Sequence, residues 1–152
     1  MNTSIPTSAS TTAARMILRV VIGFLFAAHG WQKYTQFTID GTIAAFGQMG
    51  VPAAGLVAPV MATLELVGGI AIVLGLFTRV FAGLLALGMV GALFMVHAPA
   101  GIFVEDGGFE LVAALGAGAL ALALLGAGRL SVDRLIADIR ASRANRTEMS
   151  NA

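Results

Sequence analysis

The chain has 152 residues, of which 58% are hydrophobic and only 11% are charged. Soluble domains carry about 25% charged residues, so this composition predicts a protein whose main solvent is lipid. The formal net charge of +1 predicts no nucleic-acid partner, and the absence of cysteine excludes disulfide bonds, thiol catalysis and cysteine-ligated iron–sulfur clusters in this chain. A redox role would need a quinone, a metal held by other ligands, or a partner subunit.

Residues 1–15 are rich in Ser, Thr and Ala, and we expect them to form a disordered tail. Arg15 and Arg19 then precede an apolar run, which is also the arrangement of a signal peptide. The one small-x-small triplet near the end of this run is Ala28–Gly30, which is a poor cleavage site. We therefore expect a retained first membrane helix.

A helix that crosses a bilayer needs about 20 mostly apolar residues. The stretches that meet this requirement are residues 16–34, 59–77, 79–97 and 109–126. The second and third are joined by so short a connection that they must be antiparallel neighbours. Alanine and glycine recur four residues apart, which allows the close backbone contact that drives helix association in lipid. The sequence thus predicts an all-α membrane protein whose transmembrane domain, residues 16–128, is a four-helix bundle.

Two shorter helices are expected outside the spans. One covers residues 41–49, in the connection between the first two spans. The other lies in the basic cytoplasmic tail, residues 129–152, where Leu135, Ile136 and Ile139 occur at helical spacing among arginines. A short amphipathic helix of this kind suits an anionic membrane surface, and a solvated charged tail is the alternative.

The basic residues predict the orientation, because cytoplasmic loops of membrane proteins carry an excess of arginine and lysine. In the four-span arrangement all the arginines fall on one side, namely Arg15, Arg19, Arg79, Arg129, Arg134, Arg140, Arg143 and Arg146. Lys33 falls on the other side, together with Asp40, Glu105 and Asp106. We therefore expect a multi-pass protein of a bacterial-type inner (plasma) membrane with both termini in the cytoplasm.

Five ionisable residues lie in the half of the spans that faces away from the cytoplasm: His29, Lys33, Glu65, His97 and Glu110. Polar residues within a membrane are costly, and they almost always face the protein interior. His29 and Lys33 are four residues apart and so share one face of the first helix. The two glutamates share their helical faces with small residues, which mark packing surfaces. All five side chains are therefore expected to converge inside the bundle.

The cluster has three interpretations. In the first it is a structural knot, in which Lys33 neutralises Glu65 or Glu110 and the histidines bond to backbone carbonyls. In the second, His29, Glu65, His97 and Glu110 hold a zinc, iron or manganese ion, although no compact motif such as H-E-x-x-H supports this. In the third, all five residues exchange protons with a quinone, because histidine titrates near neutral pH.

Trp31, Gln32 and Tyr34 stand beside this cluster at the end of the first span. The two aromatic residues fit either an interfacial aromatic belt or the wall of a pocket. We take all three as candidate cofactor-binding residues. A quinone is the favoured cofactor, and a bound metal is the less favoured one.

Several strings of the sequence resemble the DoxX family of membrane proteins. They are Arg19–Phe26, His29–Lys33, Glu65–Ile70, Gly75–Arg79, Glu110–Leu111 and Gly126–Asp133. The resemblance extends from about residue 15 to residue 135. It implies a four-helix membrane bundle and membrane redox work, since relatives resemble subunits of a thiosulfate:quinone oxidoreductase or are proposed to couple thiol and sulfur metabolism to oxidative-stress defence through partner proteins.

These observations lead to three hypotheses about function. The first is a subunit of a quinone-linked membrane oxidoreductase, with the five ionisable residues at the quinone. The second is a non-enzymatic membrane anchor whose arginine-rich tail, residues 129–146, docks a partner enzyme in the cytoplasm or membrane. The third is a small transporter, which would require a homo-oligomer and is disfavoured because the cytoplasmic halves of the spans lack polar residues.

Overall fold

The computed structural model describes residues 9–150, with side chains described as far as residue 143. Its α-helices are α1 (Ala9–Thr35), α2 (Ile39–Gln48), α3 (Ala54–Leu74), α4 (Thr78–Ala92), α5 (Glu110–Leu125) and α6 (Val132–Ser150). A π-helical turn, η1 (Leu93–His97), and two 3-10 turns, η2 (Ala98–Ala100) and η3 (Val104–Asp106), lie between α4 and α5. Over residues 9–150 no segment forms a β-strand, so the all-α prediction is confirmed.

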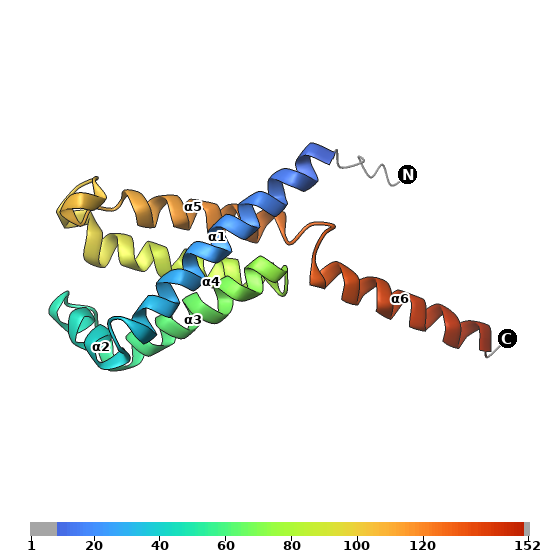
Figure 1. Cartoon of the computed structure of the whole chain (residues 1–152), viewed down its shortest axis with the longest axis horizontal. Coiled ribbons are helices and arrows are strands. Elements are labelled where there is room, and N and C mark those ends of the chain that lie inside the picture. Colours follow the sequence, from blue (N-terminus) through green and yellow to red (C-terminus); the bar gives the residue numbers. More distant parts are fainter. Residues whose placement is uncertain (1–8, 151–152) are drawn as a thin grey trace.

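The long helices α1, α3, α4 and α5 run alongside one another (Figure 1). The most extensive contacts join α1 to α3 and α4 to α5, and the contact between α3 and α4 unites the two pairs. One end of the bundle carries α2 and the connection between α4 and α5, and we call it the α2 end. At the opposite end α1 begins, α5 finishes and α6 projects away from the bundle, and we call it the α6 end.

The long helices differ in whether their apolar length is that of a membrane span. Three are long and apolar enough to cross a bilayer: Ala9–Thr35, Ala54–Leu74 and the continuous stretch Thr78–Ala100. The fourth, α5, has 16 residues, which at 1.5 Å per residue is about 24 Å, against about 30 Å of hydrocarbon core. Large apolar side chains cover the outside of the bundle, as a surface in contact with lipid requires. The chain is therefore a helical membrane protein.

Several boundaries differ from those expected. The first helix begins at Ala9, so residues 9–15, expected to be disordered, are helical; alanine, the strongest helix former, recurs in this segment. Residues 1–8 lie outside the described part of the chain. The second span begins at Ala54 and carries Pro59 inside the helix rather than at its start. The short helices expected in the first connection and in the tail correspond to α2 and α6.

The contact between α1 and α3 depends on glycine. A Cβ atom on Gly23 would lie 2.7 Å from the carbonyl oxygen of Gly69, and one on Gly69 would lie 2.6 Å from the carbonyl oxygen of Gly23. Both distances are too short for any side chain, so the two backbones touch directly. Such small-residue contacts are how helices associate in lipid, where burying apolar surface gives no driving force.

Candidate functional site

An ion pair joins α1 to α3 at the α2 end of the bundle. Lys33 is on the last turns of α1, and its ammonium group contacts the carboxylate of Glu65 on α3. The side chains retain only 17% and 6% of their accessible surface, respectively, so the pair is largely withdrawn from solvent and lipid. An unpaired charge at this depth would be strongly unfavourable, and each residue therefore requires the other.

This pair forms part of the wall of a cavity of about 490 Å³. His29 and His97 line the same cavity, so four of the five ionisable residues predicted to converge do meet around one space. They come from three elements: α1, α3 and the π-helical turn η1. The volume lies within the range of about 300–1,000 Å³ that is usual for small-molecule sites.

The rest of the cavity wall is predominantly apolar. Four methionines contribute to it: Met49, Met61, Met89 and Met95. Methionine is unbranched and polarizable, and it adapts to ligands of irregular shape. Aromatic and aliphatic side chains such as Phe26 complete the lining. A mostly apolar space with a few charged groups at one side suits a molecule that is itself apolar with a polar head.

The turn η1 positions the third polar element of the site. Its Met95 and His97 both line the cavity. A π-helical turn inserts an extra residue into a helix, and such turns are frequent at functional sites. The Nδ1 atom of His97 lies 2.7 Å from the carbonyl oxygen of Gly107. A carbonyl can only accept a hydrogen bond, so Nδ1 carries the hydrogen in this contact and Nε2 is the ring nitrogen left for a ligand.

Glu110 is not brought to the cavity. Its Oε1 atom accepts a hydrogen bond of 2.8 Å from the backbone N–H of Val104, and its own N–H donates to the carbonyl oxygen of Ile102 at 2.9 Å. The residue is exposed at the start of α5 and holds the connection from α4 in place. We expected Glu110 to join the cluster. It does not, because α5 begins at Glu110 and the side chain turns back to the preceding loop.

Trp31, Gln32 and Tyr34 also lie outside the cavity lining. Trp31 is 59% exposed on the outside of α1, and Gln32 donates to Gln36 in the turn that follows this helix. The hydroxyl groups of Tyr34 and Thr63 are 2.6 Å apart and connect α1 to α3. Trp31 and Tyr34 are therefore not part of the cavity wall, and an interfacial aromatic belt stays a prediction for them.

The four residues proposed as metal ligands do not come together in the described part of the chain. Among the described residues, no three His, Asp or Glu side chains are close enough together to hold an ion. Of the four proposed ligands, Glu65 is paired with Lys33 and Glu110 is bonded within the loop. The ionisable groups that remain at the cavity are the Lys33–Glu65 pair and the two histidines.

Neither the methionines of the cavity nor the contribution of α2 could be inferred from the sequence. Phe46 and Met49, at the end of α2, cover the cavity from outside the spans. Their amphipathic spacing in a short connecting segment is a weak signal. Only the packing of α2 against α3 brings them over the site.

The comparisons with known proteins bear on the segment that supplies these residues. The sequence profile of the DoxX family matches residues 14–98, which include His29, Lys33, Glu65 and His97. The chain belongs to the DoxX family. Among its relatives, "Putative oxidoreductase CatD" of Bacillus subtilis is 35% identical over 121 residues, which are 80% of this chain and 85% of that protein. "Inner membrane protein YqjF" of Escherichia coli is 33% identical over 121 residues, covering 80% of this chain and 90% of that protein. No solved structure matches significantly.

The dependence of the two charges in this DoxX protein on each other can be tested by substitution. Lys33→Met leaves the Glu65 carboxylate buried without its partner, and we expect a loss of about 3–5 kcal/mol in the free energy of unfolding. The double variant Lys33→Met with Glu65→Leu removes both charges, and its loss should be clearly smaller. Far-UV circular dichroism during denaturation in detergent measures both. Equal losses in the single and double variants would show that the pair is not coupled.

Proposed function

We propose that this DoxX protein is a membrane subunit of a quinone-linked oxidoreductase system and that the 490 Å³ cavity holds the quinone head group. The observation that carries the proposal is the combination of an apolar, methionine-rich space with the Lys33–Glu65 pair and two histidines in its wall. A quinone has the same division, because its ring and tail are apolar and its two carbonyl oxygens accept hydrogen bonds.

The chemistry follows from the groups in the wall. Reduction of a quinone to a quinol consumes two electrons and two protons. The Lys33 ammonium can hydrogen-bond to one carbonyl oxygen and pass it a proton, His97 can pass the second proton from Nε2 to the other, and both groups then regain their protons from water. In this proposal the two electrons come from a partner protein that oxidises a sulfur compound or a thiol. This chain has no cysteine with which to carry out such an oxidation itself. The printed name of the Bacillus subtilis relative supports an oxidoreductase system.

A second candidate function, a membrane anchor for a partner enzyme, is favoured by the position of α6. This helix projects from the bundle (Figure 1). Its Leu135 and Ile139 side chains are exposed, and each is next to an arginine in the sequence. The two functions are compatible, since a quinone-binding subunit needs a docked electron donor. A transporter is disfavoured because Phe26, Ile72, Leu85 and Leu122 fill the interior of the bundle.

We also propose that α5 completes a fourth span and that both termini lie in the cytoplasm. The arginines support this arrangement, because Arg15, Arg79 and Arg129 belong to the segments of the α6 end, whereas Lys33 belongs to the α2 end. The shortness of α5 is compatible with a span, since a bilayer thins locally around a short helix at modest cost.

Single thiols test this topology, because the chain has no native cysteine. Glu105→Cys lies in the connection before α5, and Ser142→Cys lies in α6. In intact spheroplasts a membrane-impermeant maleimide should label the first variant, and it should label the second only after lysis. Labelling of both thiols in intact spheroplasts would show that α5 does not cross the membrane.

Quinone binding tests the function itself. Purified protein in detergent and in several lipids should bind decylubiquinone or menadione, and Glu65→Gln should weaken binding about tenfold, or about 1.4 kcal/mol. His97→Phe, which keeps the ring volume, should also weaken it. Glu105→Gln is the control, because this exposed loop carboxylate is outside the cavity, and its affinity should equal that of the native protein. Absence of binding in every lipid would refute the proposal.

A further inference from the structure

A second cavity, of about 460 Å³, lies at the α6 end of the bundle. It is formed by the start of α4, the linker between α5 and α6, and the first turns of α6. Its lining has two parts. Phe77, Val80 and Leu125 are apolar and well exposed, whereas Arg79 and Arg134 bring two guanidinium groups. None of these residues takes part in the proposed quinone site at the opposite end.

The elements around this cavity are bonded to one another. The backbone N–H of Asp133 donates to the carbonyl oxygen of Gly75 at 3.1 Å, and the Asp133 carboxylate accepts from the N–H of Phe77 at 3.0 Å. Arg19 of α1, only 6% exposed, donates from Nη1 to the carbonyl oxygen of Ala127 at 2.9 Å. The α3–α4 turn, the α5–α6 linker and α6 are therefore held in a fixed arrangement around the space.

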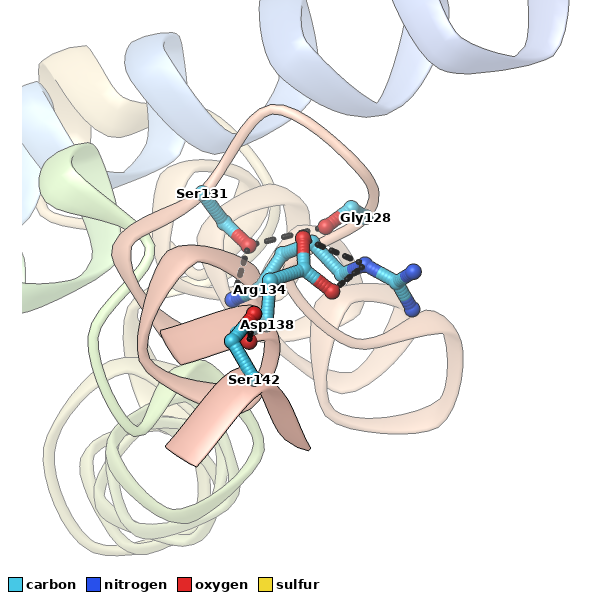
Figure 2. Close-up of polar contacts among 5 residues, drawn as sticks. All are labelled: Gly128, Ser131, Arg134, Asp138 and Ser142. Atoms are coloured by element: carbon cyan, nitrogen blue, oxygen red, sulfur yellow. Dashed lines mark hydrogen bonds and ion pairs between the residues drawn. The ribbon is translucent and has the colours of Figure 1, made fainter. Parts of the chain in front are cut away.

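The first turn of α6 orients one of the two arginines. Ser131 donates from its hydroxyl to the carbonyl oxygen of Gly128 at 2.8 Å and accepts from the N–H of Arg134 at 3.2 Å, which caps the helix (Figure 2). Arg134 Nε is 3.1 Å from Asp138 Oδ1, and the two terminal nitrogens of the guanidinium point away from Asp138 (Figure 2). Those nitrogens are the ones that a second anion would meet.

A glycine places the other arginine. Gly126 has a φ of +75°, and a Cβ atom there would be 2.9 Å from Arg79 Nε. The side chain of Arg79 thus lies directly over the backbone of the linker, where any larger residue than glycine would displace it. Two further arginines reach the linker, since Arg15 lies against Gly128 and Arg19 donates to Ala127. Arginines therefore outnumber the one carboxylate in the cavity lining, that of Asp133. The buried Nε atoms of Arg15 and Arg19 have no hydrogen-bond partner.

We propose that this cavity binds the phosphate group of an anionic phospholipid between Arg79 and Arg134, with the acyl chains along Val80 and Leu125. Guanidinium groups match phosphate oxygens in charge and in paired hydrogen-bond geometry. Basic pockets at the boundary between membrane and water are sites for anionic headgroups. The apolar part of the lining distinguishes a phospholipid from free phosphate, because only the lipid would cover Val80 and Leu125.

Native mass spectrometry and thermal unfolding of the full chain in a zwitterionic detergent test the site. Phosphatidylglycerol should remain bound and raise the unfolding midpoint. Phosphatidylcholine with the same acyl chains should need a concentration at least about tenfold higher to produce the same shift. Arg79→Gln with Arg134→Gln should remove the preference, and Arg134→Gln alone, an exposed change that leaves the helix intact, should reduce it. Arg140→Gln removes the same charge further along α6 and should bind as the native protein does.

The outcomes separate the sources of the phosphate. Inorganic phosphate and glycerol phosphate at millimolar concentration should neither raise the midpoint nor displace the lipid. If they do either, the site binds free phosphate and the lipid proposal is overturned. Equal binding of phosphatidylglycerol and phosphatidylcholine, or an Arg140→Gln variant that loses as much as Arg134→Gln, would also overturn it. Binding of menadione by the same variants reports separately on the cavity at the α2 end.

Discussion

The buried ion pair between Lys33 and Glu65 is the constraint on which the α2 end depends. Two charges cannot be left unpaired within a membrane protein, so the pair fixes the rotation and the axial position of α1 against α3. The direct backbone contact between Gly23 and Gly69 fixes the same two helices further along. With both contacts made, His29 must face the cavity, one turn before Lys33 on the same side of α1.

Much of the fold and of the α2-end cavity could be predicted from the sequence, because the patterns that indicate them lie within single helices. Composition predicts the membrane, apolar length predicts the long helices, and four-residue spacing places His29 and Lys33 on one face. Depth within the spans also places Glu65 and His97 in the same half of the bundle. The confirmed parts are therefore those that depend on one helix at a time or on a shared depth.

The remaining features depend on how helices rotate and end. Glu110 leaves the cluster because α5 begins at that residue and its carboxylate is taken by Val104 of the preceding turn. Trp31 faces outward because His29 and Lys33 lie on the face of α1 that points to the cavity. Phe46 and Met49 reach the cavity only because α2 folds back over α3. These positions cannot be predicted from residue spacing within a single segment.

The two ends of the bundle in this DoxX protein carry different sets of polar side chains. The α2 end gathers ionisable side chains around an apolar cavity, and the α6 end gathers arginines around the linker to a projecting helix. Between them lie the fully buried apolar side chains of Phe26, Ile72, Leu85 and Leu122. In the proposed function, the α2 end receives the quinone and the α6 end meets the partner.

Photolabelling with an azidoquinone, followed by peptide mass spectrometry, locates the bound quinone. If the quinone occupies the cavity at the α2 end, adducts should form on residues of its wall, such as Met61, Met95 and His97, and excess menadione should suppress them. Adducts confined to lipid-facing residues such as Phe24 and Leu87, or adducts that menadione does not suppress, would contradict a quinone site in this cavity.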